Sequence, residues 1–385
     1  MKNKFLLDPS ITYLNHGSFG ACPKPIFEEF QRLQSELETE PVQFIVKKSL
    51  AYLKEAKQRL SKYIGCSPED FFFTPNPTVA VNTILKSLNL QEGDEILSTN
   101  HEYGAMDKTW NFFCRKTGAK YVRQDISLPI ISKEKLLEEF WSGYTSKTKV
   151  VFINEISSAT ALIFPVKEIC QKAQELGLIT IIDGAHVPGH IDLNILELNP
   201  DFYTGTLHKW MLSPKGNSFL YVKKEFQKDI NPLVVGWGYD NPVYIESEFL
   251  DNHEYQGTRD ISAYLCTPKV IDFLEENNWK EVSNECKVIV RENYQRFCDL
   301  LKSKPLCPIT EEFLGQMASI QINTEEPVKL KELLFEKYKI EIPVMPLNGK
   351  IYLRYSINGY NSQEDLDVLY KALQEILETT NLIAV

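Results

Sequence analysis

Two stretches of the chain decide its fold: Leu178-Ile-Thr-Ile-Ile-Asp183-Gly-Ala-His186 and Asp201-Phe-Tyr-Thr-Gly-Thr206-Leu-His208-Lys209-Trp210. The first is an uninterrupted apolar run that ends on an acid, which is typical of a strand buried on both faces of a parallel sheet. The second predicts a strand over Asp201–Gly205 with a lysine shortly after it. We therefore expect Asp183 and Lys209 at the ends of neighbouring strands, where open α/β sheets bind their ligands.

Strands and helices alternate on both sides of these stretches. Further strands are predicted at Asp70–Thr74, Glu95–Ser98, Lys149–Ile153 and Ser218–Val222, and helices at Ile26–Leu37, Lys47–Ile64, Thr78–Leu90 and Val166–Leu176. This alternation favours an α/β fold with a mostly parallel sheet covered by helices on both faces.

After Gly257 the regular alternation of strands and helices gives way to a long, charged helical stretch and then to short strands. This change predicts a second, smaller α+β domain. One long helix is expected from Ser262 to about Leu301, followed by strands at Ala318–Ile322 and Lys350–Ile357 and a helix at Gln363–Leu377. We predict an N-terminal segment over residues 1–20, a large domain over 21–260, and the long connecting helix with the small domain over 261–385. A length of 385 residues suits two unequal cores.

The composition narrows the classes of function. A net charge of −10 argues against a nucleic-acid binder, because no basic surplus exists to neutralise phosphates. We expect no signal peptide and no membrane span, because no apolar run is long enough for either. The eight cysteines are scattered without a Cys-x-x-Cys pair, so neither a metal site nor a disulfide framework is expected. The prediction is a cytoplasmic protein that binds neither nucleic acid nor membrane.

Asp183 follows a buried strand, where an unpaired charge is costly. The protonated nitrogen of a pyridine-type cofactor would give this carboxylate a cationic partner, and the ion pair would keep the ring an effective electron sink. The alternative is a carboxylate that only caps the next turn.

Lys209 stands in a setting that differs from that of most lysines, which are solvated surface residues. It follows a predicted strand and lies between His208 and Trp210. Such surroundings desolvate the amine and lower its pKa, as Schiff-base chemistry requires.

The segment Phe71-Phe-Phe-Thr-Pro-Asn76-Pro-Thr78 runs from a predicted strand into the start of a helix. Free N–H groups and the positive dipole end of a helix N-terminus bind anions, and Thr78 adds a hydroxyl, so a phosphate site is predicted here. The alternative is a threonine N-cap with no ligand. No glycine-rich loop accompanies the segment, which argues against a dinucleotide-dependent dehydrogenase.

Arg354 lies in the alternating run Ile351-Tyr-Leu-Arg-Tyr-Ser-Ile357. Alternation places it on one face of a strand with Tyr352 and Ser356, opposite a more apolar face. We expect the apolar face to pack on helices. Arg354 then points either to solvent from an edge strand or into the cleft between the domains.

Six motifs, taken in order, carry a resemblance to a known family. They are Asn76 with Thr78, Glu102-Tyr103, Asp183-Gly-Ala-His186, Thr206-Leu-His208-Lys209, Gly257-Thr258-Arg259 and Leu353-Arg354-Tyr-Ser356. The set resembles the class V aminotransferases, a family that includes cysteine desulfurases, C–S lyases, kynureninases and isopenicillin N epimerase. The resemblance runs from about residue 12 to about residue 370. The opening Tyr13-Leu-Asn15-His16-Gly-Ser-Phe-Gly20 is most similar to the isopenicillin N epimerase-like branch.

The resemblance implies the fold of the pyridoxal-phosphate-dependent transferases (aspartate aminotransferase-like). That fold has a large domain with a mostly parallel seven-stranded sheet and a smaller α+β C-terminal domain. It implies pyridoxal 5′-phosphate as cofactor, bound to Lys209 as an internal aldimine, with Lys209 afterwards shuttling the Cα proton. Asp183 would pair with the pyridinium nitrogen, Tyr103 would stack on the ring, and His186 would hydrogen-bond its phenolic oxygen.

The remaining site residues are implied in the same way. Thr78, Thr206 and His208 would bind the phosphate, and Asn76 and Ser158 would lie against the cofactor. Gly257 and Thr258 would reach the phosphate from the other subunit, which makes a homodimer with a shared active site part of the prediction. Arg354 would clamp the substrate carboxylate, and Asn15 and His16 would contact the substrate.

Three departures from the family pattern bear on the chemistry. Pro77 removes one backbone N–H from the phosphate loop. Ser158 stands where many relatives have an asparagine. The stretch from Glu341 to Gly349 holds no cysteine, whereas desulfurases of the family carry their persulfide-forming cysteine in this region.

The expected activity is that of a pyridoxal-phosphate enzyme acting on an amino acid or a similar substrate through an external aldimine and a Cα carbanion. Epimerisation and C–S lysis are the two leading outcomes, and transamination is the third. A catalytically silent family member is the alternative to an enzyme, although such a protein would not need Lys209, Asp183 and Arg354 together.

Overall fold

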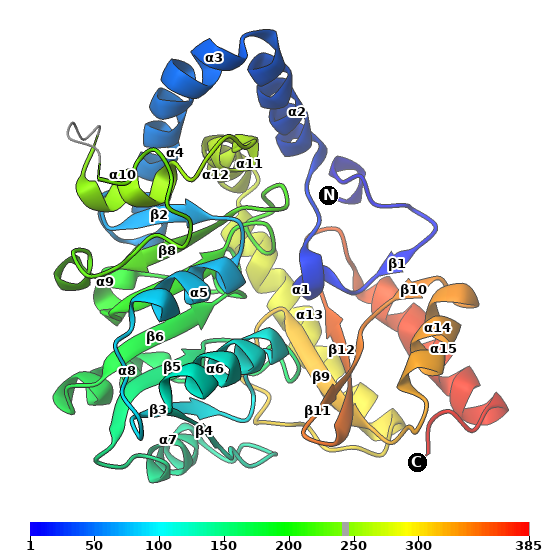
Figure 1. Cartoon of the computed structure of the whole chain (residues 1–385). Coiled ribbons are helices and arrows are strands. Elements are labelled where there is room, and N and C mark those ends of the chain that lie inside the picture. The colour runs from blue at the N-terminus through cyan, green and yellow to red at the C-terminus, as the bar shows by residue number, and fades with distance from the viewer. Residues whose placement is uncertain (241–245, 385) are drawn as a thin grey trace.

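The computed structural model describes residues 1–240 and 246–384 (Figure 1). The molecule has a large sheet with helices on both sides, a smaller sheet with its own helices, and an N-terminal segment that runs between them. Among the described residues no helix combines the length and the apolar character needed to cross a bilayer.

The large sheet has seven strands in the order β2-β8-β7-β6-β5-β3-β4. Their bounds are β2 Phe71–Thr74, β3 Glu95–Thr99, β4 Lys120–Gln124, β5 Thr148–Asn154, β6 Ile179–Gly184, β7 Phe202–Thr206 and β8 Ser218–Val222. Only β8 runs in the direction opposite to the other six strands, so the predicted mostly parallel seven-stranded sheet is confirmed. The sequence patterns had not indicated β4, an edge strand whose residues are all exposed or only partly buried.

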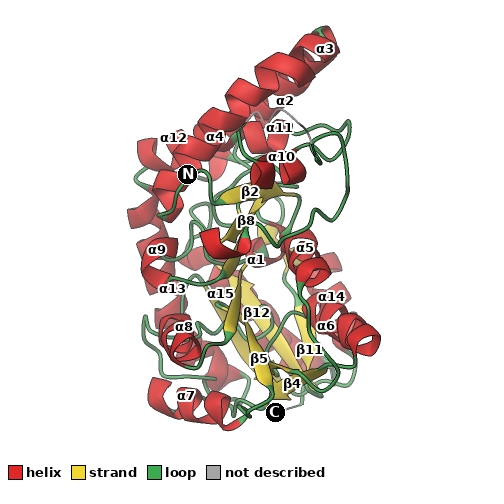
Figure 2. Ribbon diagram, turned by 60° about the vertical axis from the view of Figure 1, so that its left-hand side comes forward, coloured by secondary structure: helices red, strands yellow, loops and turns green. Residues whose placement is uncertain are grey.

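Helices cover both faces of this sheet. In Figure 2, α5 (Pro77–Ser87) and α6 (Gly104–Thr117) lie on one side of the strands, and α7 (Lys133–Ser142) and α8 (Val166–Glu175) lie on the other. Successive residues of β5 point to opposite faces of the sheet. Val150 and Phe152 pack in the core under α5 and α6, and Val151 and Ile153 pack in the core on the other face. Burial of each such side chain contributes roughly 1.5–3 kcal/mol.

The first helices form an arch at the top of Figure 1. It consists of α2 (Lys24–Thr39), the short α3 (Pro41–Gln43), the π-helical turn η2 (Phe44–Lys48) and α4 (Ser49–Ile64). The large domain also contains the short helices α9 (Ile195–Leu198), η3 (Lys224–Phe226) and α10 (Glu248–Glu254).

The predicted long helix after Gly257 is wrong, because the segment is broken into α11 (Ser262–Leu265), α12 (Thr267–Glu276) and α13 (Trp279–Leu300). Pro268 stands in the first turn of α12, and Asn278 has a left-handed backbone with φ 47°. A proline starts a helix far more easily than it continues one, and a left-handed residue ends one. The break positions α13 between the two sheets (Figure 1).

The small domain contains a three-stranded antiparallel sheet in the order β11-β12-β9. Its strands are β9 (Met317–Ile322), β11 (Val344–Leu347) and β12 (Lys350–Ser356), and its helices are α14 (Pro327–Glu336) and α15 (Gln363–Thr379). Because β11 lies on the outer side of β12, β12 is a central strand.

The N-terminal segment attaches to the small domain rather than to the large sheet. Strand β1 (Thr12–Tyr13) pairs in parallel with β10 (Ile340–Glu341), and the N–H of Ser356 donates to the carbonyl of Leu14. The segment then forms the single turn α1 (His16–Phe19). The segment begins with the short 3-10 helix η1 (Lys2–Lys4). Its pairing with the small domain places it between the two domains (Figure 1).

Candidate active site

Asp183 and Lys209 meet at one edge of the large sheet, as expected. Strands β6 and β7 are parallel neighbours, with Asp183 opposite Thr204 in the register. Asp183 stands at the end of β6, and Lys209 follows β7 by one short turn. Because the carboxyl ends of parallel strands lie at the same edge, the carboxylate and the amine belong to one site.

The amine of Lys209 lies 3.2 Å from Nε2 of His186. Burial, with a smaller contribution from the nearby cation Arg354, lowers the pKa of Lys209 to about 8, and Asp183 opposes the shift. A lysine with this pKa has a far larger neutral fraction near neutral pH than an ordinary lysine, and the neutral form is the one that attacks a carbonyl.

The carboxylate of Asp183 is almost fully buried and has only one partner among the described residues. One carboxylate oxygen, Oδ1, accepts the N–H of Ala185 at 3.0 Å, so this oxygen caps the turn as the alternative predicts. The other oxygen stays available for a ligand. Burial raises the pKa of Asp183, whereas the Ala185 N–H and the charge of Lys209 lower it.

A second buried acid lies behind this edge of the sheet. Glu102 accepts hydrogen bonds from the hydroxyl of Thr99 at 2.7 Å and from the side chain of Asn154 at 2.7 Å. Burial raises the pKa of Glu102 to about 8, and the charge of Asp183 acts in the same direction. This anchored residue precedes Tyr103, whose half-exposed side chain stands at the start of α6.

The start of α5 offers donors for an anion. Asn76 caps the helix, because its side chain accepts the N–H of Val79 at 3.0 Å, so the threonine N-cap considered as the alternative is wrong. Pro77 occupies the first helical position, where its missing N–H costs nothing. The N–H and hydroxyl of Thr78 have no protein partner among the described residues.

Thr206 adds a hydroxyl to this donor set, and His208 follows it two residues later. Ser218 of β8 pairs with Thr74 on one side and with Thr206 on the other, so the start of α5 and the end of β7 share one edge. The hydroxyl of Thr206 is fully buried without a partner among the described residues. His208 donates from Nδ1 to the carbonyl of Asn217 at 3.0 Å, so Nε2 of the neutral ring carries a lone pair, and the predicted phosphate contact of His208 stays a prediction. A buried hydroxyl without a partner calls for a ligand, and a phosphate fits.

Arg354 is 1% exposed on the central strand β12, so the exposed arginine on an edge strand is ruled out. Its guanidinium donates to the main-chain carbonyl of Ser158 and, at 3.1 Å, to the hydroxyl of Ser18. Its Nε has no partner, and no carboxylate pairs with it among the described residues. Burial lowers the pKa of Arg354 to about 10.

The N-terminal motif connects the lysine with the arginine. His16 is fully buried, and its Nε2 donates to the carbonyl of Lys209 at 3.0 Å while its Nδ1 accepts the hydroxyl of Tyr360 at 2.8 Å. Gly20 has φ +67°, and a side chain there would lie 2.2 Å from the carbonyl oxygen of His208. This close approach explains the glycine.

Asn15 and Ser18 connect the N-terminal motif to Arg354. The hydroxyl of Ser18 donates to Asn15 at 2.5 Å, and Asn15 donates to Glu341 at 3.2 Å. All three line a pocket of ≈ 590 Å³ beside Arg354. Asn15 therefore borders open space, whereas both ring nitrogens of His16 are occupied by protein atoms. The predicted substrate contacts of the two residues remain predictions.

Two predicted ligands make no contact with the site within one chain. Gly257 has φ +110° with open space around it, and Thr258 lies in the same surface loop. Neither hydrogen-bonds to the other site residues among those described. Their expected role from a second subunit remains a prediction.

Two residues of the site were missed from the sequence. Ser18 accepts from Arg354, and the indole N–H of Trp210 donates to Nδ1 of His186 at 3.3 Å. Ser18 had a signal, because it lies within the quoted opening motif. For Trp210, the only signal in the sequence was its position directly after Lys209.

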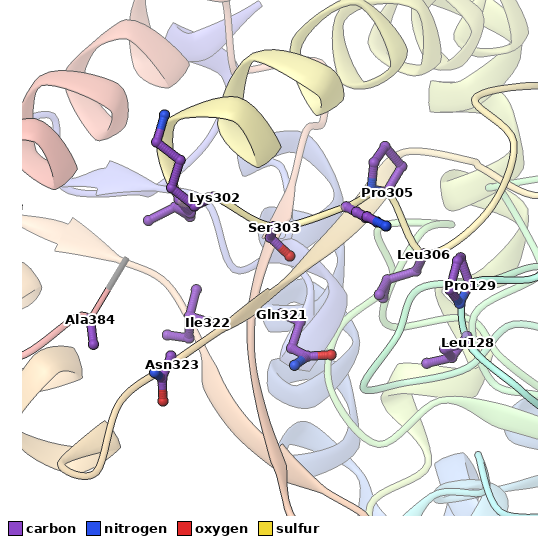
Figure 3. A pocket seen from close by; sticks show the side chains of 12 residues that line it. Leu128, Pro129, Lys302, Ser303, Pro305, Leu306, Gln321, Ile322, Asn323 and Ala384 are labelled. Atoms are coloured by element: carbon purple, nitrogen blue, oxygen red, sulfur yellow. The ribbon is translucent and has the colours of Figure 1, made fainter.

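Another hollow lies elsewhere in the molecule (Figure 3). It measures ≈ 410 Å³ and lies between the loop after β4 and the segment around the ends of α13 and β9. Leu128, Pro129, Lys302, Gln321 and Asn323 are among its lining residues, and none of the residues discussed above borders it. We assign it no part in the chemistry.

Comparison with known proteins places the chain in a family. Residues 23–369 match the model of the family described as aminotransferase class-V. Isopenicillin N epimerase of Amycolatopsis lactamdurans is 30% identical over 387 residues, covering 96% of each chain. A probable chloroplastic L-cysteine desulfhydrase of Arabidopsis thaliana is 25% identical, covering 96% of this chain and 84% of the relative. A cysteine desulfurase of Thermococcus onnurineus NA1 superimposes with a TM-score of 0.83 at 19% identity, covering 98% of this chain and 97% of the other. The chain therefore belongs to the class V aminotransferase family of pyridoxal-phosphate-dependent enzymes.

Proposed function

We propose that this enzyme removes the Cα proton from an amino acid or amino-acid-like substrate with a free α-carboxylate, in an epimerase-like or C–S lyase-like reaction. The observation that carries the proposal is the buried cation Arg354 with no carboxylate partner among the described residues. Burial of an unpaired charge costs several kcal/mol unless a ligand compensates it. A substrate carboxylate would accept two parallel hydrogen bonds from the guanidinium.

The protein groups divide the work around the cofactor. Pyridoxal phosphate, when bound, supplies an electron sink for the charge that develops at Cα. Asp183 would offer its free oxygen to the ring nitrogen, Thr78 and Thr206 would offer donors to the phosphate, and His208 would add a donor in its imidazolium form. Lys209 would hold the cofactor covalently and would then take up or return the Cα proton, since its pKa of about 8 allows both protonation states near neutral pH.

Desulfurase chemistry through an enzyme persulfide is not supported. Six of the eight free cysteines are buried. The other two, Cys22 and Cys66, are partly buried, and burial raises the pKa of each thiol to about 12. A persulfide-forming cysteine has to be accessible and easily ionised. Sulfur would instead leave directly from the substrate if the reaction is a C–S lysis.

Epimerisation and C–S lysis are both supported by relatives. The isopenicillin N epimerase is 30% identical, and the probable cysteine desulfhydrase is 25% identical. The two reactions share proton removal at Cα and differ in the next step, which is either return of the proton to the opposite face or loss of a β-substituent. Transamination, with the proton returned to the cofactor carbon, is the third outcome.

The working unit we propose is a homodimer in which Gly257 and Thr258 complete the phosphate site of the partner. Support comes from the unused, open position of this loop in the single chain. Large apolar side chains gather near it. Gly236 packs closely on Tyr255 and Gln256, and next to it Trp237 is 86% exposed. Exposed apolar clusters of this kind mark interaction surfaces.

A cytoplasmic location is part of the proposal. It is supported by the cysteines, all eight of which are free thiols. Disulfides are the rule in oxidising compartments and rare in the cytosol.

The lysine assignment is tested by reduction of the purified protein. Borohydride should fix the cofactor covalently, and peptide mapping should find the label on Lys209. The matched control is Lys215, an exposed lysine near the site, whose amine donates to the carbonyl of Gly20. A label on Lys215 or any other lysine would overturn the assignment.

The reaction is tested by incubation of the holoenzyme with single D- and L-amino acids, cysteine conjugates and peptides that carry a free α-amino acid end. Solvent-deuterium uptake at Cα with inversion indicates an epimerase, and release of pyruvate or a thiol indicates a lyase. Absence of Cα exchange with every substrate bearing a free carboxylate would contradict the proposal.

A further inference from the structure

Both ring nitrogens of His186 have side-chain partners. The indole Nε1 of Trp210 lies 3.3 Å from Nδ1, and the amine of Lys209 lies 3.2 Å from Nε2. His186 is 3% exposed, so water does not compete freely for either nitrogen.

The chemistry of the indole decides which nitrogen carries the proton. An indole N–H is a donor and never an acceptor, so Nδ1 must present its lone pair to Trp210. A neutral imidazole has one N–H, which is then on Nε2. Burial, together with the cations Lys209 and Arg354, holds the pKa of His186 well below its usual range and so keeps the ring neutral. His186 therefore points an N–H at Lys209 when the lysine amine is neutral and can accept it, because the ammonium form, like the indole, only donates.

Trp210 is held so that it cannot turn away. Its ring is fully buried, stacks on His190 with centroids 4.1 Å apart, and packs on His16 at 4.8 Å. Gly189 has φ +84°, and a side chain there would lie 2.4 Å from the carbonyl oxygen of Trp210. Backbone and ring are thus both fixed by packing.

His190 is itself fixed from both sides. Its Nδ1 donates to the carbonyl of His186 at 2.9 Å, and its Nε2 accepts the N–H of Gln316 at 2.5 Å. Its ring therefore supports the indole without offering Nδ1 of His186 another donor. Among the described residues, Trp210 alone hydrogen-bonds to that atom.

We propose that Trp210 is a positioning residue that fixes His186 in the Nε2–H tautomer and so makes His186 a hydrogen-bond donor to the phenolic oxygen of bound pyridoxal phosphate. This inference rests on the proposed role of Lys209, because it places the cofactor's phenolic oxygen beside the lysine amine that His186 now faces. A donor at this point withdraws charge from the phenolic oxygen. The linkage between lysine and cofactor then loses its proton more readily.

Trp210→Phe removes the donor and keeps an aromatic ring for the stack. His186 can then adopt the Nδ1–H tautomer, which turns a lone pair towards the phenolic oxygen. The pH at which the visible absorbance of the holoenzyme titrates should rise by roughly 0.5–1 unit, the size of one net hydrogen bond. Trp110→Phe is the matched control: Trp110 is equally buried, its indole N–H has no partner among the described residues, and its loss should leave the titration unchanged.

A second pair of variants separates the tautomer from packing. Glutamine in place of His186 keeps an N–H donor without a second tautomer. In the His186→Gln background, Trp210→Phe should therefore produce no further shift, which the double-mutant cycle measures. An equal shift in both backgrounds, or none in either, would mean that Trp210 acts through packing and would overturn the proposal.

Nitrogen NMR of ¹⁵N-histidine-labelled protein tests the tautomer without cofactor chemistry. In cofactor-free wild-type protein above about pH 8, where the amine of Lys209 is neutral, Nδ1 of His186 should show the shift of an unprotonated nitrogen, and Nε2 that of a protonated one. The reverse pattern would refute the inference. This measurement stays decisive if Trp210→Phe does not fold, and it stands even if borohydride mapping disproves the role of Lys209.

Discussion

At the scale of single residues, the site is a cluster of cations short of acids. Lys209 and Arg354 are close enough that the arginine disfavours the charge of the lysine, and Asp183 is the acid that opposes this effect at Lys209. Such a cluster costs stability in the free protein. It prepares the site for a ligand that carries negative charge at two points, a phosphate and a carboxylate.

The first prediction concerns the pH dependence of Lys209. Because its pKa is lowered from 10.5 to about 8, the neutral, reactive amine dominates above about pH 8 instead of above 10.5. Labelling of cofactor-free protein with pyridoxal phosphate and borohydride should thus rise through about pH 8. Arg354→Gln removes a neighbouring cation and should move the profile to higher pH, and Asp183→Asn should move it to lower pH. A wild-type midpoint near 10.5 would contradict the prediction.

The second prediction concerns Arg354 and the substrate. Lysine at this position keeps the charge but loses the two parallel hydrogen bonds, so Arg354→Lys should reduce kcat/KM by roughly ten- to a hundredfold, mainly through KM. Arg354→Ala should reduce it further. Amides of the substrate should react as poorly with the wild type as the free acids do with the alanine variant. Unchanged kcat/KM in both variants would remove Arg354 from the site.

At the scale of elements, the start of α5 combines a structural and a binding task. Asn76 satisfies the N–H of Val79, and this capping leaves the donors of Thr78 for a ligand. The positive end of the helix dipole adds to their attraction for a phosphate.

A matched pair of variants at Asn76 separates these two tasks. Asn76→Ala should lower the free energy of unfolding by about 1 kcal/mol, because a helix cap is lost. Asn76→Asp keeps the cap and should unfold like the wild type, yet it places a negative charge beside the phosphate and should release the cofactor faster on dialysis. Equal retention by Asn76→Asp and the wild type would separate Asn76 from the phosphate site.

Elements with a strong pattern were predictable, and those defined by tertiary neighbours were not. The apolar run of β6 and its final Asp183 indicated both the strand and the site, because a parallel strand buried on two faces has a distinctive composition. β4 and β11 are short edge strands with partly exposed residues, and no period marks them. Without β11, strand β12 seemed an edge, and the burial of Arg354 could not be derived from alternation alone.

The contacts of the site depended on packing that the sequence does not encode locally. His16 and Lys209 are far apart in the chain, and their hydrogen bond exists only because β1 pairs with β10. The break between α12 and α13 was available in the sequence as Pro268 and the Asn277-Asn278 pair. The charged helical pattern continued across both and concealed it.

At the scale of the whole molecule, one chain does not supply every predicted ligand. The loop with Gly257 and Thr258 lies open at the surface, while the site that it should serve holds donors for a phosphate. The proposed homodimer would resolve this mismatch, because the loop of a second copy would supply the missing ligands.

Mixed dimers test whether Thr258 acts across the interface. A heterodimer of a Lys209→Ala chain with a Thr258→Ala chain should retain one complete site and its cofactor, because the intact lysine meets the partner's threonine. A heterodimer of a wild-type chain with a chain that carries both Lys209→Ala and Thr258→Ala should bind cofactor poorly at its single remaining lysine, because the partner's threonine is missing there. If Thr258 acted within its own chain, the results would be reversed. Sedimentation showing a fully active monomer would also refute the shared site.

The path of residues 12–20 has a practical consequence for protein engineering. The ends of most globular proteins can be trimmed with little effect, as long as their backbone is neither buried nor hydrogen-bonded. Here His16 holds the backbone of Lys209, and Ser18 holds the guanidinium of Arg354. Residues 12–20 thus connect Lys209, the group proposed to react, with Arg354, the group proposed to bind the substrate carboxylate. Shortening this segment past residue 11 would therefore disable both at once, although it lies far from either in the printed sequence.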